Sequence, residues 1–261
     1  MNITALGTHA AYAGPGNACT GWLVQDGGVN LLLDCGTGVI ARLQQVLPPA
    51  QITAIVISHL HADHFFDLTP LRHALRYGPN PEGARPTLLL PPGGQATLAG
   101  MSQALHWADE KGAGGYYEGV FDLREYRGDE PLRAGHLELR FAPGVHYIPS
   151  WAVAVRSLEA GGRSVAYTGD TGPSDAVAEL AARADLLIAE ATYLSLDEEG
   201  GPQRGHMTGF EAGELAAKAR VAQALVTHQW PHRPPGAALA QAKQRFSGPI
   251  DDAQPGACYK L

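Results

Sequence analysis

The feature that most constrains this chain is a cluster of metal-ligand side chains at the end of a core strand. Residues 52–58 form a continuous, largely β-branched run, which is typical of a buried strand. The run leads directly into Ser58-His59-Leu60-His61-Ala62-Asp63-His64. In an extended segment residues i and i+2 point to the same side, so His59 and His61 can present two imidazoles to one ion. Asp63 and His64 follow as the chain turns and diverge from that pair, which favours a second ion beside the first.

Three further candidate ligands also follow predicted strands. His146 comes after a strand over 136–142 and a Pro-Gly turn, Asp170 after a strand over 164–168, and His228 after a strand over 221–227. Each position alone has a plainer interpretation, as a surface histidine, a helix-capping aspartate or a strand-end histidine. Together with the motif they complete two coordination spheres. Neutral imidazoles with carboxylates suit zinc, and manganese or iron less strongly.

The order of predicted elements indicates the fold class. The chain opens with paired strands over 3–6, 20–25 and 29–34, and only later do strands and helices alternate. A simple doubly wound sheet or a βα barrel alternates from the start, so two mixed sheets with helices outside fit better. No repeat or polar linker divides the chain, which predicts one domain over residues 1–261. Further strands are predicted over 87–90, 152–157 and 185–190, and helices over 36–46, 95–107, 174–183 and 236–246.

Several helix ends carry capping signals. Thr69 before Pro70 predicts the start of a helix that ends at Gly78-Pro79. Ser174 is the predicted N-cap of the next, and Thr208-x-x-Glu211 is a capping box for a helix that runs to Ala219. Residues 108–119 are a Gly-rich loop, where Tyr116 and Tyr117 are expected to serve loop packing rather than substrate binding.

Composition limits the classes of partner. The chain has 261 residues and 19 Lys+Arg against 26 Asp+Glu, a formal charge of −7. This balance disfavours a non-specific grip on long nucleic acid. No run approaches the ~20 apolar residues of a membrane helix, and the start resembles no secretory signal. With three scattered cysteines, these features predict a cytoplasmic protein.

The motif His59-x-His61-x-Asp63-His64, followed by His146, Asp170 and His228, resembles the metallo-β-lactamase superfamily. The resemblance implies a four-layer αββα sandwich of two mixed β-sheets, with a dinuclear site at one edge. It implies that one ion takes His59, His61 and His146, the other Asp63, His64 and His228, and that Asp170 bridges them. Asp34, in the early Leu-Asp-Cys-Gly turn, is then expected to brace the ligand loop.

Particular residues resemble the ribonuclease Z branch. His61 replaces the usual glutamate of the diiron oxidoreductases, and Asp170 replaces the cysteine of the best-known β-lactamases. Gly205-His206-Met207-Thr208 and Ala189-Glu190-Ala191-Thr192 are similar to segments of the ribonuclease Z branch, where the loop histidine contacts the scissile phosphate. Residues 14–20 lack that branch's Lys and Arg, and no basic arm for the tRNA elbow is evident. A short-form relative is therefore expected.

The implied activity is that of a phosphodiesterase in which a metal-bridging hydroxide attacks phosphorus. Asp63 would orient the hydroxide and take its proton, His206 would bind the phosphate or protonate the leaving alkoxide, and Glu190 would orient His206. His206 and Glu190 also have plainer interpretations, as a polar residue near an N-cap and a strand-end residue.

Substrate and partners are less constrained. The expected substrate is a small phosphodiester or an RNA 3′ end, and the resemblance to ribonuclease Z implies a homodimer. One alternative is a lactonase or thioesterase acting on carboxylic esters. The other is a catalytically silent metal-binding relative, whose expected signature, lost ligands, is absent. His9 directly follows the first predicted strand, where loops of the superfamily that the chain resembles often border the active site.

Overall fold

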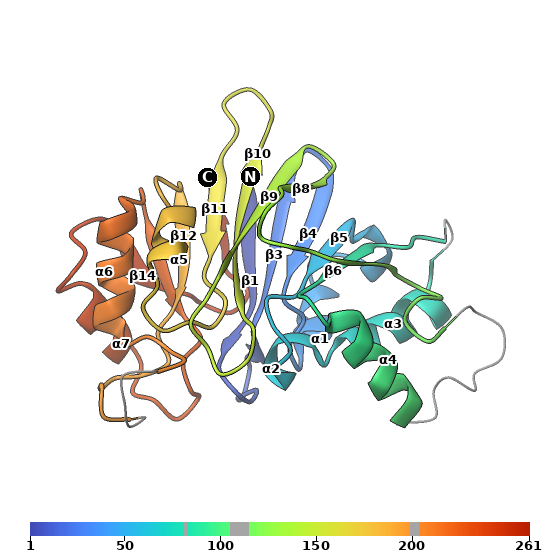
Figure 1. Ribbon diagram of the computed structural model, residues 1–261, viewed down its shortest axis with the longest axis horizontal. Coiled ribbons are helices and arrows are strands. Elements are labelled where there is room, and N and C mark those ends of the chain that lie inside the picture. Colours follow the sequence, from blue (N-terminus) through green and yellow to red (C-terminus); the bar gives the residue numbers. More distant parts are fainter. Residues whose placement is uncertain (81–82, 105–114, 199–203) are drawn as a thin grey trace.

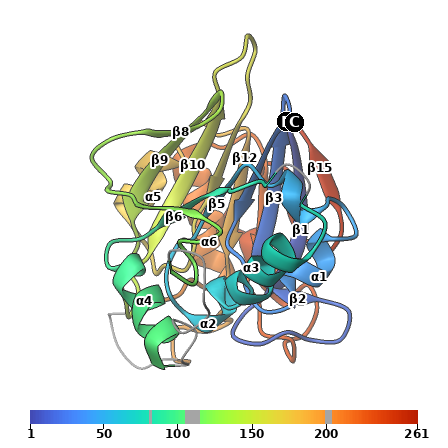
Figure 2. The ribbon, with the colours of Figure 1, turned by 90° about the vertical axis from the view of Figure 1, so that its right-hand side faces the viewer.

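Two mixed β-sheets lie face to face in the computed structural model, with helices on the outer face of each (Figures 1 and 2). The structure describes residues 1–80, 83–104, 115–198 and 204–261. This arrangement confirms the four-layer αββα sandwich predicted from the sequence. Among the described residues, no helix combines the length and apolar character needed to cross a membrane.

The first sheet has the strand order β15-β1-β3-β4-β5-β6-β7, with β2 beside β1. Its strands are β1 (Asn2–His9), β2 (Ala18–Cys19), β3 (Gly21–Asp26), β4 (Val29–Leu33), β5 (Ala54–Val56), β6 (Thr87–Leu90), β7 (Asp122–Glu125) and β15 (Cys258–Lys260). The helical segments that follow β4, β5 and β6 are α1 (Val39–Leu43), the 3₁₀ turn η1 (Pro49–Gln51), α2 (Ala62–Phe65), α3 (Leu68–Tyr77) and α4 (Gly94–Ala104).

The second sheet has the order β14-β13-β12-β11-β10-β9-β8. Its strands are β8 (Leu132–Ala134), β9 (Leu137–Pro143), β10 (Trp151–Ser157), β11 (Ser164–Tyr167), β12 (Leu186–Glu190), β13 (Ala224–Thr227) and β14 (Ile250–Asp252). Its helices are α5 (Asp175–Leu180), α6 (Gly209–Ala219) and α7 (Ala237–Ala242).

Three apolar layers hold the four structural layers together. The central layer packs the inner faces of the sheets, with Trp22 and Leu33 against Val153 and Val155, all fully buried. The second lies between the first sheet and α1, α3 and α4, and the third between the second sheet and α5, α6 and α7. Burying one such side chain contributes about 1.5–3 kcal/mol, so each layer fixes the helices it covers.

The parallel strands determine where the candidate functional residues lie. β4, β5, β6 and β7 are parallel in the first sheet, and β11, β12, β13 and β14 in the second. The carboxyl ends of parallel strands meet at one edge, which is where ligands bind in such sheets. The segments leaving these ends carry Asp34, the histidine motif, Asp170, Glu190 and His228.

The predicted helix starts are confirmed for α5 and α6 but not for α3. Ser174 and the Thr208/Glu211 capping box begin α5 and α6 as predicted. The prediction of Thr69 as an N-cap is wrong: α3 begins one residue earlier, at Leu68, and Asp67 precedes it. The Asp67 carboxylate instead accepts a hydrogen bond from Ile40 N (2.9 Å), which ties α3 to α1.

Some elements differ in extent. The helices predicted over 36–46 and 236–246 shorten to α1 and α7, because turns take up their ends. The helix predicted over 95–107 begins at Gly94 and is described to Ala104; its predicted end, and residues 108–114 of the predicted loop, lie outside the described residues. Tyr116 and Tyr117 are buried in the layer over the first sheet, which confirms their packing role.

Candidate metal centre

The histidine motif spans a sharp change of backbone direction. β5 ends at Val56, His59 lies in the following extended segment, and α2 begins at Ala62. Asp63 and His64 therefore project from the first helical turn, but His64 does not diverge from His59 as the spacing predicted, since their ring centroids lie 4.0 Å apart. His59 and His64 are fully buried, whereas His61 is partly exposed.

All seven predicted ligand residues come together, in two groups that share Asp170. In the first, the Nε2 atoms of His59 and His146 lie 3.2 and 3.0 Å from His61 Nδ1. In the second, His228 Nε2 lies 3.1 Å from His64 Nε2 and 3.3 Å from Asp63 Oδ2.

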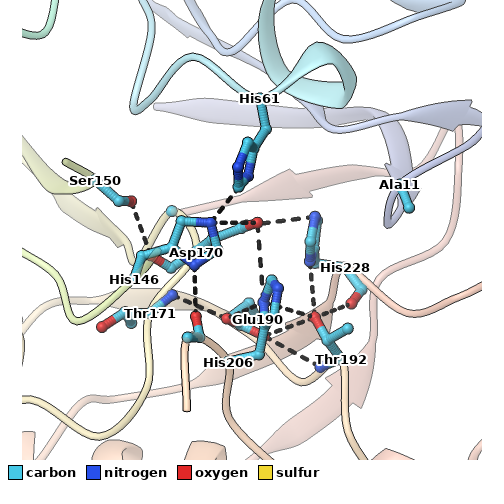
Figure 3. Close-up of polar contacts among 12 residues, drawn as sticks. Ala11, His61, His146, Ser150, Asp170, Thr171, Glu190, Thr192, His206 and His228 are labelled. Carbon is cyan, nitrogen blue, oxygen red and sulfur yellow. Dashed lines mark hydrogen bonds and ion pairs between the residues drawn. The ribbon is translucent and has the colours of Figure 1, made fainter. Parts of the chain in front are cut away.

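Asp170 lies between the two groups. Its Oδ2 is 3.5 Å from His59 Nε2, and its Oδ1 is 3.3 Å from the Nε2 atoms of both His64 and His228. Figure 3 shows Asp170 between His61, His146 and His228. Each group can supply three or four ligand atoms to one ion.

Hydrogen bonds behind the cluster orient four of the imidazoles. The Nδ1 atom of each contacts an acceptor outside the cluster: Ser58 Oγ for His59 (3.0 Å), Asp34 Oδ2 for His64 (2.7 Å), Gly205 O for His146 (2.7 Å) and Thr192 Oγ1 for His228 (2.8 Å). With Nδ1 as the donor, a neutral ring presents the Nε2 lone pair to the cluster. Such outer hydrogen bonds fix the tautomer and direction of metal-binding histidines.

The cluster needs positive charge at its centre. The Nε2 atoms of His64 and His228 and both carboxylate oxygens of Asp170 approach one another with lone pairs. Asp170 Oδ1 is buried and has no hydrogen-bond partner in the described part of the chain, although an unsatisfied buried carboxylate oxygen is costly. Divalent cations resolve both problems, since every atom that points inward is a ligand atom. The residues present therefore fit a pair of metal ions.

Without a bound ion, the pKa directions agree with this chemistry for three of the rings and differ for His64. Burial lowers the pKa of His59, His61 and His146, which keeps these rings neutral, as metal ligands must be. Burial also opposes charge on His64, yet the carboxylates of Asp170, Asp34 and Asp63 raise its pKa well above the usual value. Although burial acts against ionisation, neighbouring histidines hold the pKa of Asp63 and Asp170 below the ordinary range.

Glu190 and His206 form a pair at the rim of the cluster. Glu190, at the end of β12, is buried, and its Oε1 lies 2.9 Å from His206 Nδ1. The same oxygen accepts from Thr171 N, and Oε2 accepts from Thr192 N and Thr192 Oγ1 (Figure 3). Glu190 is thus fixed by three donors, and it holds His206 beside His146 and His228. Asp170, His206 and His228 also meet the spacing of a metal site, but Glu190 takes His206 Nδ1.

The geometry agrees with the comparison to known protein families. Residues 29–229 match the family model described as the Beta-lactamase superfamily domain. The chain belongs to this family.

The relatives of this chain include a probable metallo-hydrolase and a ribonuclease Z. The chain is 30% identical over 257 residues to the probable metallo-hydrolase YhfI of Bacillus subtilis, covering 98% of both chains. It is 28% identical over 307 residues to a ribonuclease Z of Haloferax volcanii, covering 98% of this chain and 93% of that one.

Solved structures show the same fold. The YhfI crystal structure matches with a TM-score of 0.81 at 26% identity over 99% of each chain. The short form of human tRNase Z matches with a TM-score of 0.76 at 23% identity, over 100% of this chain and 99% of that one. The resemblance to ribonuclease Z-like members of the superfamily is therefore confirmed.

The structure adds residues to this superfamily site that the sequence did not single out. Ala11 N donates to Asp63 Oδ2 (2.6 Å), and Tyr167 OH donates to Asp34 Oδ2 (2.6 Å). Ser58 and Thr192 hold imidazoles, as described above. The only signal for such residues in the sequence is a place beside a motif residue. Ser58 and Thr192 have such a place, and Tyr167 does not.

A small cavity of about 90 Å³ opens over the cluster. Its lining includes Ala10, Ala11, Trp230 and His206. His9 does not border this cavity; it lines a neighbouring one.

Proposed function

We propose that this chain is a phosphodiesterase that works with two divalent metal ions, zinc being the first expectation. His59, His61 and His146 would hold one ion, Asp63, His64 and His228 the other, and Asp170 would contact both. The observation that carries the reaction class is the Glu190–His206 pair, which places an oriented imidazole beside an otherwise complete cluster. The ribonuclease Z relatives support the same class.

Two bound ions would supply a water of lowered pKa and positive charge opposite the phosphate. The side chains of this protein carry out the proton transfers and hold the substrate. Asp63, positioned by Ala11 N, accepts a hydrogen bond from the attacking water and takes its proton. His206 is held through Nδ1, so Nε2 is the atom that binds a phosphate oxygen or gives a proton to the leaving alkoxide. Glu190 keeps His206 in that orientation and is a positioning residue.

The test is hydrolysis of bis(p-nitrophenyl) phosphate by protein of measured metal content. The His206→Ala variant should lose about 10²–10⁴-fold in kcat, the usual contribution of general acid–base catalysis. The matched control is His73→Ala, because His73 lies on α3, contacts Tyr116 and is outside the cluster.

Two results would contradict the proposal. One is an unchanged rate in His206→Ala with full metal content. The other is a clear preference of the native chain for a lactone or thioester, which would favour a carboxylic ester hydrolase. The metal's identity, the homodimer and the cytoplasmic location stay predictions.

A further inference from the structure

A second cavity, of about 290 Å³, lies next to the metal cluster. We call it the side cavity; Thr8, His9, Thr227, Gln229, Arg233 and Asp252 are among its lining residues. Its volume is at the lower end of the ~300–1,000 Å³ typical of small-molecule sites.

The side cavity and the cluster cavity share a wall. His9 and Gln229 pair where β1 and β13 end, and they face the side cavity. Their neighbours Ala11 and His228 face the cluster cavity, and Trp230 borders both. Trp230 is therefore the residue at which a substrate held at the cluster would meet the side cavity.

Two buried polar atoms of the lining residues lack a hydrogen-bond partner among the residues that the structure describes. Thr227 is 1% exposed, and its Oγ1 is unsatisfied. Arg233 Nε is also buried without a partner among the described residues, although another nitrogen of that guanidinium pairs with Glu198. Leaving such a group unpaired is costly, so a ligand that supplies partners is favoured.

The lining offers both donors and acceptors. His9 Nδ1 accepts from Gly14 N (3.1 Å), which leaves the proton of the neutral ring on Nε2 as a donor. Asp252 contributes a carboxylate, whose Oδ1 accepts from Gln229 Nε2 (3.1 Å). Thr227 Oγ1 can do either.

This combination of donors and acceptors favours some chemical groups over others as ligands of the side cavity. A second phosphate only accepts hydrogen bonds and would be repelled by Asp252. A flat base needs an open aromatic face, but Trp230 is already in contact with the Arg233 guanidinium (4.5 Å) and the near-parallel His232 ring (5.5 Å). A hydroxyl group both donates and accepts, so neighbouring hydroxyls match the lining best.

We propose that the side cavity binds a vicinal diol on the alcohol esterified to the substrate phosphate. The inference rests on the proposed phosphodiesterase function. Ribose and glycerol both carry such a diol, and the experiment must separate these sources.

Four p-nitrophenyl phosphodiesters form two matched pairs. One pair carries glycerol or n-propanol, and the other the 5′-oxygen of uridine or of 2′,3′-dideoxyuridine. Within a pair the diol form should have a KM about tenfold lower, which corresponds to one well-paired group at about 1.4 kcal/mol. If the diol form has the lower KM in both pairs, the side cavity recognises the diol itself. If only one pair shows the difference, the cavity recognises the glycerol or the ribose of that pair.

Thr227→Val removes the hydroxyl while keeping the shape. Because that hydroxyl is unsatisfied, the variant should fold at least as stably as the native chain. Its KM ratio between diol and deoxy forms should fall from about ten towards one. Thr97→Val, on the exposed face of α4, loses a hydroxyl elsewhere and should keep the full ratio.

A binding measurement keeps the inference independent of turnover. Calorimetric affinity for glycerol 1-phosphate should exceed that for propyl phosphate, and Thr227→Val should abolish the difference. Absence of turnover for every diester would overturn the proposed function. Turnover without diol preference, equal affinity for the two monoesters, or an unchanged ratio in Thr227→Val would overturn this inference alone.

Discussion

Asp34 gathers four donors on one buried carboxylate. Its Oδ1 accepts from Ser58 N, and its Oδ2 contacts Ser58 Oγ, His64 Nδ1 and Tyr167 OH, all at 2.6–2.7 Å. The residue has φ of 58°, in the left-handed region that is costly for most side chains. A strained residue with this many partners is held in place to direct His64.

Replacing Asp34 by Asn tests that role. Asn tolerates the left-handed backbone, but it lacks the charge and one acceptor. We expect zinc affinity to fall about 10–100-fold, the usual effect of losing a partner behind a metal ligand, as measured by competition with a chromophoric chelator. Tyr167→Phe, which removes one donor and leaves the carboxylate, should cost less. Native affinity in folded Asp34→Asn would show that His64 needs no such support.

The three cysteines differ in reactivity because they differ in burial. Burial, with Asp63 adding to it, raises the pKa of Cys19 to about 12, and burial raises that of Cys35 well above its usual value. A raised thiol pKa means that almost no thiolate exists below that pH. At pH 8 a disulfide reagent should therefore titrate one thiol, the exposed Cys258, and all three only after unfolding. Rapid loss of two or three thiols in the native chain would contradict this.

At the scale of elements, α6 and α7 approach each other through small residues. A Cβ on Gly209 would lie 2.2 Å from Ala238 O, and one on Gly213 would lie 2.4 Å from Ala242 O. These two glycines, one turn apart, let the helix backbones meet. The same packing places Thr208 and the preceding His206 loop over the cluster.

Gly213→Ala should therefore destabilise the chain by about 1–3 kcal/mol, since a backbone oxygen cannot move aside easily. Gly100→Ala is the matched control, because a Cβ there meets nothing within 4 Å in exposed helix α4. That variant should gain about 0.5–1 kcal/mol. Urea unfolding measures both, and a neutral Gly213→Ala would mean that α7 can shift at little cost.

At the scale of the molecule, the cluster joins the two sheets. The motif residues 59–64 follow β5 of the first sheet, whereas His146, Asp170 and His228 follow strands of the second. Bound ions would therefore tie the sheets together across the central apolar layer. Without them the carboxylates and imidazoles of both sheets face one another uncompensated.

Chelation should lower the unfolding temperature, and added zinc should restore it. A ligand at 1,000 times its Kd stabilises by about 4 kcal/mol, so the shift should amount to several degrees or more in a calorimetric scan. Asp170→Ala, which lacks the residue shared by both groups, should show a much smaller response to the chelator. An equal response in native and variant chains would place the relevant metal elsewhere.

The sequence predicted the residues that gather in the cluster better than it predicted the edge strands of the sheets, for a physical reason. His59, His61 and Asp170 stand where buried apolar runs end, so periodicity marks their positions. β7, β8, β14 and β15 are short, partly polar edge strands, and their pattern does not differ from that of loops. Thr192 and Tyr167 act through contacts with residues far away in the chain, which spacing cannot reveal.

The pairing of β1 with β15 has a consequence for how the chain folds. Asn2 lies opposite Lys260, and Figure 2 shows the two ends side by side. During synthesis β1 can pair with β3 and β2 early, but the first part of its other edge, at residues 2–4, stays open until the second sheet has been made and the chain returns. An open strand edge invites pairing with other chains. The interval before β15 pairs is therefore when this protein is most exposed to aggregation. Because β1 and β15 lie at opposite ends of the sequence, their pairing predicts a slow final step of folding.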